Sequence, residues 1–278
     1  MTAAEFEDGL FDMDGASEFA NILIYGDPGS QKTRLTGTAP GYNLFLAAEP
    51  GYISAARNGF NGKARMITDT ASANAAVSWL EDGNASKFDF IIVDGGSSFM
   101  NKILLEYAAE AYDLSNGTKR AHRNLPDKPD YLNAQNFMKA WTARLIDLPC
   151  HLVMTTHVMV TEDREGDPWV KPNFQGKAGE VSDYIAGQFH VVGYVKPATM
   201  KVKGEGEEKP KSVQVIRALW NAYKDDKSDI TYFAKDQFGT LGRMSTNPNM
   251  TEIIEKITGQ PFTSRVESAA PAKKSRKK

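Results

Sequence analysis

The feature that most constrains this chain is an apolar strand that runs directly into a glycine-containing loop at residues 21–33, Asn-Ile-Leu-Ile-Tyr-Gly-Asp-Pro-Gly-Ser-Gln-Lys-Thr. The sequence is close to G-x-x-x-x-G-K-[ST], in which backbone N–H groups surround phosphates, the lysine reaches the β/γ-phosphates and the hydroxyl binds Mg²⁺. Gly26, Lys32 and Thr33 match this pattern, whereas Gln31 stands where the second glycine is expected. We interpret the stretch as a phosphate-binding loop with one departure from the pattern.

An ordinary turn is the alternative, because Asp-Pro-Gly favours turns in any context. We prefer the nucleotide interpretation, because a buried strand precedes the loop and a second motif follows at a suitable distance. A residue with a side chain tolerates a positive φ less well than glycine, so Gln31 predicts a strained loop. The residues predicted to contact the nucleotide are Gly26, Asp27, Pro28, Gly29, Ser30, Gln31, Lys32, Thr33 and Arg34.

Length and composition indicate one large α/β domain with appendages. The 33 basic and 35 acidic residues neither indicate nor exclude a nucleic-acid partner. The single cysteine, Cys150, excludes an internal disulfide framework and suits a reducing cytoplasm. The acidic N-terminus does not resemble a signal peptide, and no apolar run approaches the ~18 residues that span a bilayer. We therefore expect a cytoplasmic protein with no membrane partner.

The two ends of the chain carry opposite charges. Seven acidic residues and no lysine or arginine lie between residues 2 and 31, and five basic residues and no acid lie in residues 269–278. We predict an acidic N-terminal arm at 1–18, a core at 19–260 and a disordered basic tail at 261–278. The tail is either a solubilising segment or a tether to DNA phosphates.

Three predicted strands end on a polar side chain. Residues 42–48 lead to Glu49, residues 88–94 end on Asp94 before two glycines, and residues 151–156 lead to His157. An acid at the end of a central strand beside a phosphate loop is the Walker B pattern, and it holds Mg²⁺ or its water shell. Taken alone, His157 would be a core or edge histidine. Because the carboxyl ends of parallel strands share one rim, we expect Glu49, Asp94 and His157 to lie together there.

The remaining elements follow from hydrophobic periodicity and turn residues. A short strand is predicted at 64–68, a further strand at 190–195, and a hairpin from residues 194–202 and 213–220. Polar loops are predicted at 114–130 and 160–178. Helices are predicted at 32–38, 53–57, 71–81, 97–112, 134–148, 181–188 and 250–258.

The order of phosphate loop, LFLAAE, FIIVDGG and VMTTH resembles the RecA/RadA core, over roughly residues 19–258. More narrowly, the chain is similar to small phage RecA-like ATPases of the single-strand annealing and recombination type. The resemblance implies an α/β fold with a RecA-like P-loop core, a mostly parallel sheet flanked by helices and an appended C-terminal β-hairpin. It also implies a bacterial host cytoplasm if the chain is phage-encoded.

The same resemblance implies roles for individual residues. Glu49 would activate the attacking water, Lys32 would neutralise the phosphates of ATP, and Thr33 and Asp94 would hold Mg²⁺. His157 would couple the γ-phosphate to a DNA-contacting loop.

Residues 234–239, Ala-Lys-Asp-Gln-Phe-Gly, are similar to the Lys-Asn-Arg-Phe-Gly motif of RadA, whose lysine reaches the nucleotide of a neighbouring subunit. Lys235, Phe238 and Gly239 match this motif, and Asp236 and Gln237 do not. The resemblance therefore implies that Lys235 acts on a neighbour's site.

We expect a DNA-dependent ATPase that forms a homo-oligomer, as a ring or a filament, on single-stranded DNA, with a single-strand DNA-binding protein as a further partner. The two polar loops suit DNA, since cations match phosphates and aromatic rings stack on bases. Two alternatives stay open: a nucleotide-binding regulatory or scaffold protein with little hydrolysis, which Gln31 favours, and a small-molecule kinase, which needs an arginine-rich lid. The loop residues that suggest DNA contact are Lys119, Arg120, His122, Arg123, Lys128, Arg164, Lys171, Lys177, Trp169 and Phe174.

Overall fold

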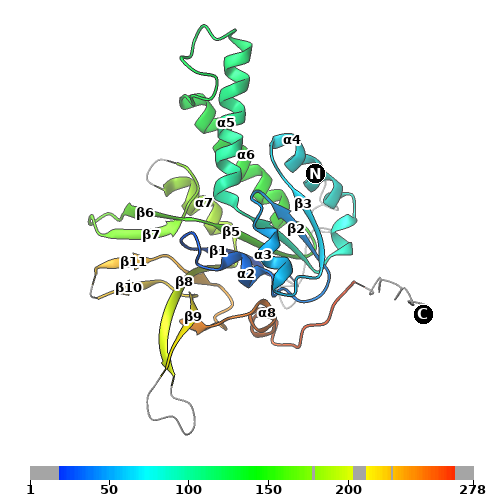
Figure 1. Ribbon diagram of the computed structural model, residues 1–278, viewed down its shortest axis with the longest axis vertical. Helices are drawn as coiled ribbons and strands as arrows, with labels where there is room; N and C mark the ends of the chain where they lie inside the picture. The colour runs from blue at the N-terminus through cyan, green and yellow to red at the C-terminus, as the bar shows by residue number, and fades with distance from the viewer. Residues whose placement is uncertain (1–18, 177–178, 203–210, 227, 267–278) are drawn as a thin grey trace, which may run out of the picture.

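The computed structural model describes residues 19–176, 179–202, 211–226 and 228–266 (Figure 1). Its centre is a nine-stranded sheet in the order β13-β9-β8-β1-β5-β4-β2-β3, with β12 paired to β8 off this path. The run from β8 to β3 is parallel, and β9, β12 and β13 are antiparallel to their neighbours. The parallel strands are β1 (Asn21–Tyr25), β2 (Asn43–Ala47), β3 (Gly62–Met66), β4 (Phe90–Asp94), β5 (His151–Thr156) and β8 (Val191–Val202).

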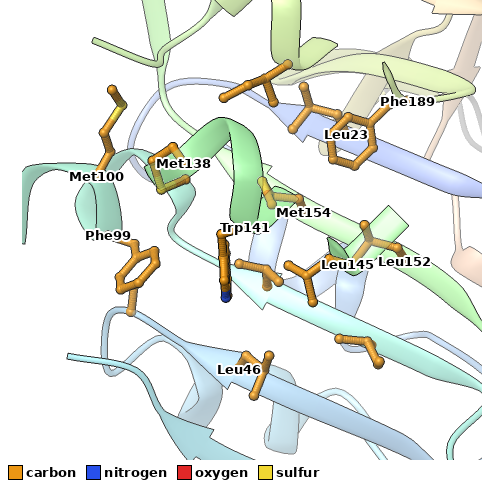
Figure 2. Close-up of a cluster of buried hydrophobic side chains, with 14 of the residues drawn as sticks. Leu23, Leu46, Phe99, Met100, Met138, Trp141, Leu145, Leu152, Met154 and Phe189 are labelled. Atoms are coloured by element: carbon orange, nitrogen blue, oxygen red, sulfur yellow. The ribbon is translucent and has the colours of Figure 1, made fainter. Parts of the chain in front are cut away.

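Strands β1, β2, β4 and β5 are buried along their whole length, because helices cover both faces of the sheet. Successive residues serve opposite faces: Leu23 and Tyr25 belong to one apolar cluster, and Ile22 and Ile24 belong to the other. Figure 2 shows the first cluster, in which Trp141 lies among leucine, methionine and phenylalanine side chains.

Four helices contribute to the cluster that contains Trp141, and three to the cluster on the opposite face. The first group is α4 (Thr70–Glu81), α5 (Gly96–Leu114), α6 (Lys128–Ile146) and α7 (Glu180–Gln188). The second group is α2 (Lys32–Thr36), α3 (Tyr52–Arg57) and α8 (Met250–Thr258). With the hairpin of β8 and β9 (Lys211–Leu219), this arrangement confirms the predicted fold class, a mostly parallel sheet flanked by helices with an appended hairpin.

Helix α6 begins at Lys128, six residues before the predicted start at 134, so the predicted loop at 114–130 is wrong at its end. Asp127 caps the helix by accepting a hydrogen bond from the Lys128 N–H at 2.7 Å, and the Asp127 N–H donates to Asp130 at 2.8 Å. Pro129 lies in the first turn, where its missing N–H costs no helical bond. The proline and the charged residues had suggested a loop.

The predicted loop at 160–178 contains a hairpin instead. Its strands, β6 (Val158–Glu162) and β7 (Pro168–Pro172), join β11 (Ile230–Tyr232) and β10 (Tyr223–Asp225) in a second sheet ordered β10-β11-β7-β6. The turn is tight, because the Asp163 carboxylate accepts from the N–H groups of Glu165 and Asp167, each at 2.9 Å, and Gly166 has φ 89°.

Residues 261–266, predicted as the start of a disordered tail, pack on the amino edge of the sheet. The Arg265 N–H and the Ser264 hydroxyl donate to the buried Asp89 carboxylate at 2.9 and 2.7 Å. The Arg265 guanidinium donates to the Pro149 carbonyl at 2.8 Å and lies 4.3 Å from the Phe19 ring centre. The core therefore continues to Val266, beyond the predicted boundary at 260. The acidic arm at 1–18, Lys177 and the basic residues after 266 lie outside the described residues.

The buried amino edge predicts an acid-sensitive fold. Burial, with a smaller effect of Arg265, lowers the pKa of His151 to about 4, and its Nδ1 accepts from the Ala20 N–H at 3.0 Å. Because the folded protein disfavours a protonated His151, protonation stabilises the unfolded chain. The contribution of His151 to the free energy of unfolding is therefore complete above pH ~6.5 and falls by up to about 3 kcal/mol as the pH drops to about 4. His151→Asn keeps an acceptor for Ala20 and should flatten this fall in urea denaturation at several pH values.

The matched control is His122→Asn, on the exposed 115–127 loop, which should keep the pH dependence of the unaltered protein. An equally steep fall in His151→Asn would mean that other groups cause the acid sensitivity.

Candidate nucleotide-binding site

The loop after β1 has the backbone shape that its sequence demands. A Cβ on Gly26 would lie 2.2 Å from the Val195 carbonyl oxygen and 2.6 Å from the Ser30 hydroxyl, so this position has no room for a side chain. Gly29 has φ 78°, and Gln31 has φ 69° and ψ 26°. The predicted strain at Gln31 is confirmed, because a non-glycine residue occupies the left-handed region. Its side-chain oxygen accepts from Arg34 at 2.9 Å.

The Lys32 ammonium lies inside this loop and is 8% exposed. It donates to the carbonyl oxygens of Gly26 and Asp27 at 2.8 and 2.9 Å and to the Ser30 hydroxyl at 3.4 Å. Burial lowers the pKa of Lys32, and the nearby carboxylates of Asp94, Asp27 and Glu49 oppose that effect. The loop thus encloses the Lys32 ammonium, and an anionic ligand could replace the carbonyl oxygens as its hydrogen-bond acceptor.

The Asp94 carboxylate ends β4 beside this lysine and is 4% exposed. The Thr33 hydroxyl lies 3.0 Å from both carboxylate oxygens, and the Thr155 hydroxyl donates to Oδ1 at 2.6 Å. Thr155 also accepts from the Gly95 N–H at 3.0 Å. Burial raises the pKa of Asp94, although both hydroxyls oppose the shift. Thr155 was not predicted from the sequence, where its only signal was a hydroxyl in a buried strand.

Glu49 and His157 lie together on the same rim, as the strand ends predicted. His157 Nε2 is 3.7 Å from Glu49 Oε1, and the two side chains are 32% and 41% exposed. The Ser98 hydroxyl, at the start of α5, donates to the same glutamate oxygen. His157 Nδ1 is buried, and within the described part of the chain it has no hydrogen-bond partner. Ser98 was not predicted from the sequence as a residue of the site.

A cavity of about 470 Å³ connects these groups, a size typical of small-molecule sites. It opens where β1, β2, β4 and β5 end, since these strands run in the same direction. Its lining is Pro28, Gly29, Gln31, Lys32, Thr33, Arg34, Glu49, Ser54, Asp94, Gly95, Thr155, Thr156 and His157.

The residues present fit a nucleotide with Mg²⁺. Gly26 and Gly29 open the loop, Lys32 supplies a buried cation, and the first N–H groups of α2 have no partner inside that helix. The Thr33 hydroxyl and the Asp94 carboxylate are oxygen ligands of the kind that Mg²⁺ prefers. Within the described residues no three His, Cys, Asp or Glu side chains form a metal cluster, so any cation here would also need oxygens from its ligand.

Lys235 does not line this cavity. It lies on β12 (Lys235–Asp236), opposite Val192 in β8, and its ammonium donates to the Gly187 carbonyl at 3.0 Å. Burial lowers the pKa of Lys235. The structure therefore does not place Lys235 in the cavity of its own chain.

Several predicted DNA-contacting residues serve the protein's own structure instead. Phe174 is fully buried, and Lys171 is 3% exposed and paired with Asp183 at 2.9 Å. Arg120 pairs with Asp130, and Arg123 pairs with Asp113 at 2.7 Å. The prediction that Phe174 and Lys171 face DNA is wrong, because Phe174 packs in the apolar cluster that includes α7 and the Lys171 ammonium is paired with Asp183 of α7.

Comparison with known proteins places this site in a family. A protein-family model described as an AAA domain matches residues 18–237, which include every residue of the cavity. The chain belongs to the AAA domain family. Among solved structures, this AAA domain protein is similar to the RadB recombinase, with 10% sequence identity and a TM-score of 0.43 over 82% of this chain and 86% of that chain. A search of curated proteins gives no match. No helix within the described ranges is long and apolar enough to cross a membrane.

The left-handed backbone of Gln31 predicts that Gln31→Gly strengthens the site. Glycine removes a conformational penalty of about 1 kcal/mol and loses only the exposed hydrogen bond to Arg34. The expected result is a higher melting temperature together with tighter ATP binding or faster turnover, measured by calorimetry and phosphate release.

Asn116→Gly is the matched control, since Asn116 has φ 49° and does not line the cavity. This change should leave nucleotide affinity unaltered. Weaker ATP binding and slower turnover in Gln31→Gly would show that the glutamine side chain itself contacts the nucleotide.

Proposed function

We propose that this AAA domain protein binds ATP with Mg²⁺, hydrolyses it and acts on single-stranded DNA. The observation that carries the proposal is the convergence of Lys32, the Thr33–Asp94 pair and the Glu49–His157 pair on one cavity. These groups come from separate segments of the chain. The packing of the core does not require all of them to face the same cavity.

The phosphate end of the nucleotide would lie in the loop. Lys32 would exchange its bonds to the Gly26 and Asp27 carbonyl groups for bonds to phosphate oxygens, which carry full charge and bind an ammonium more strongly. Thr33 and Asp94 would hold Mg²⁺, which when bound neutralises developing charge on the phosphates. The Thr155 hydroxyl holds the Asp94 carboxylate by donating to Oδ1.

Glu49 is the proposed general base for hydrolysis. Its carboxylate is partly exposed to the cavity, so it can contact a water molecule, and Ser98 and His157 limit its orientation. His157 directly precedes β6. A displacement of His157 caused by the phosphate end of the nucleotide would therefore also shift the second sheet. We assign His157 this coupling role.

The surface proposed for DNA differs from the two loops that the sequence suggested. The end of β6 and the turn to β7 carry Glu162, Asp163, Glu165 and Asp167 beside one cation in the segment, Arg164. Lys224 pairs with Asp167 at 2.7 Å, so the region keeps a net negative charge, which repels phosphates.

The ribbon of β8 and β9 extends away from the body (Figure 1) and has the opposite charge. Its described residues include no acid and four cations, namely Lys196, Lys201, Lys211 and Arg217. Lys196 lies directly opposite Arg217, and such like-charged pairs are unfavourable without an anion. We assign the ribbon a role in holding the sugar-phosphate backbone.

The alternative of a nucleotide-binding regulatory protein with little hydrolysis rests on Gln31, a non-glycine residue whose backbone is left-handed where the pattern expects glycine. The kinase alternative has less support. Its candidate lid arginines, Arg120 and Arg123, are tied to Asp130 and Asp113, and neither lines the cavity.

We further propose a homo-oligomer, ring or filament, in which Lys235 reaches a neighbour's nucleotide. A cytoplasmic location, a phage origin, a role in annealing or recombination and a single-strand DNA-binding partner belong to this same proposal.

The proposal predicts that Lys32→Ala abolishes ATP binding while the fold survives. Glu49→Gln should keep ATP affinity and suppress hydrolysis by a factor of about 10² or more, since general-base catalysis contributes on that scale. Calorimetry, circular dichroism and phosphate release measure these effects.

Glu110→Gln, at an exposed position of α5, is the control and should leave both properties unchanged. Unchanged ATP affinity in Lys32→Ala would overturn the site, and equal loss of binding and hydrolysis in Glu49→Gln would make Glu49 structural.

The ribbon predicts that Lys201→Gln with Lys211→Gln weakens single-stranded DNA binding. Each lost phosphate contact should reduce the salt slope by about 0.7, hence about 1.4 for the pair. Fluorescence anisotropy across a salt series measures this slope, with Lys119→Gln and Lys128→Gln near the α5–α6 tip as the comparison pair. A smaller slope for the comparison pair alone would move the DNA surface to that tip.

A further inference from the structure

Gly51 lies in the turn that leads from Glu49 into α3. Its φ of −64° and ψ of −21° are helical values that any residue adopts, so the backbone does not require a glycine here. The reason for the glycine must therefore lie in what surrounds its α-carbon.

A side chain at this position would collide with the candidate metal ligands. A Cβ on Gly51 would lie 2.6 Å from Asp94 Oδ2 and 3.5 Å from both Oγ1 and Cγ2 of Thr33. The first distance is well inside van der Waals contact. One of the two partners would have to move.

Asp94 cannot move without loss. Its Oδ1 is held by the Thr155 hydroxyl at 2.6 Å, both of its oxygens lie 3.0 Å from Thr33 Oγ1, and the residue is 4% exposed. Rotating the carboxylate away from a new methyl group would break these bonds in a buried site, where an unpaired carboxylate is costly.

The turn cannot retreat easily either. Helix α3 packs against α2 so closely that a Cβ on Gly37 would lie 2.9 Å from both the α-carbon and the carbonyl oxygen of Ala55. Ala55 is fully buried in this contact. Moving α3 outward would separate two surfaces that now touch at the backbone.

We propose that Gly51 is a positioning residue for a divalent cation: the absence of its side chain keeps Asp94 Oδ2 and Thr33 Oγ1 aimed at a common point. This inference rests on the proposed function, in which Thr33 and Asp94 hold the Mg²⁺ of a bound nucleotide. The inference extends that function by assigning the Glu49–Gly51 turn a part in shaping the metal site. Groups one step removed from a metal commonly affect its affinity by tenfold or more.

Gly51→Ala tests the inference through ADP affinity, which is independent of turnover. In EDTA, ADP should bind with an affinity within about twofold of the unaltered protein, because the three atoms nearest to the new methyl group belong to the metal ligands Asp94 and Thr33 and not to Lys32. The gain in ADP affinity on adding Mg²⁺ should fall by about tenfold. Titration with Mn²⁺, followed by electron paramagnetic resonance, should show the same loss directly.

Gly187→Ala is the matched control, since a Cβ on Gly187 meets nothing within 4 Å and the residue lies in α7. It should keep the full Mg²⁺ response. Thr33→Ser combined with Gly51→Ala is a second variant, which removes the Thr33 Cγ2 atom next to the new methyl and keeps the hydroxyl. The 2.6 Å overlap with Asp94 Oδ2 remains in this double variant, so its Mg²⁺ response should still be reduced relative to Thr33→Ser, and it replaces Gly51→Ala if that variant does not fold.

The outcomes separate the two levels of the proposal. Absence of Mg²⁺-dependent ADP binding in the unaltered protein would overturn the proposed function and this inference with it. A normal Mg²⁺ response in folded Gly51→Ala, or in the double variant compared with Thr33→Ser, would overturn the role of Gly51 alone. Loss of ADP binding in EDTA would also overturn it, because Gly51 would then support the loop rather than the metal ligands.

Discussion

The buried Asp94 carboxylate is the interaction on which the candidate site depends. It joins the end of β4 to Thr155 in β5 and to Thr33 in α2, and the Gly51 turn lies so close that a Cβ at Gly51 would be 2.6 Å from Asp94 Oδ2. An acid in such surroundings is stable only if its oxygens are bonded, and both threonine hydroxyls serve that need. The cost of burying Asp94 therefore fixes the relative positions of the strands and the phosphate loop.

The same burial acts in opposite directions on the two charges of the site. It raises the pKa of Asp94 and lowers the pKa of Lys32, since a low-dielectric environment disfavours either charged form. The Asp94 carboxylate is the charge that most opposes the shift at Lys32, whereas the Thr155 and Thr33 hydroxyls most oppose the shift at Asp94. A bound ligand with both negative and positive components would stabilise both charged groups. A site built in this way favours a phosphate together with a cation over a phosphate alone.

The two edges of the central sheet have separate tasks. The carboxyl edge holds the partly exposed Glu49 and His157, whereas the amino edge is closed by Arg265 and Ser264 over the buried Asp89. The second sheet begins directly after His157, and the Ser97 hydroxyl ties that residue to Asn173 by accepting from the His157 N–H at 3.0 Å and donating to the Asn173 carbonyl at 2.7 Å. These hydrogen bonds connect the rim to the residues that flank the hairpin of β6 and β7.

The sequence by itself determined the phosphate loop, the polar strand ends and the fold class, because each is a local pattern: an apolar run, a glycine or an acid at a fixed position. It also determined the ends of α8, where Asn249 caps the helix and Gly259 ends it in the left-handed conformation. Only the tertiary structure decided the rest. Thr155, Ser98 and Gly51 form no site pattern in the sequence, since each meets its carboxylate only in the folded chain: Thr155 and Gly51 lie next to Asp94, and Ser98 lies next to Glu49. Phe174 and Lys171 suggested a DNA surface because an aromatic ring and a cation occur close together in the sequence. Their burial beside α7 results from tertiary packing, which the neighbouring residues do not reveal.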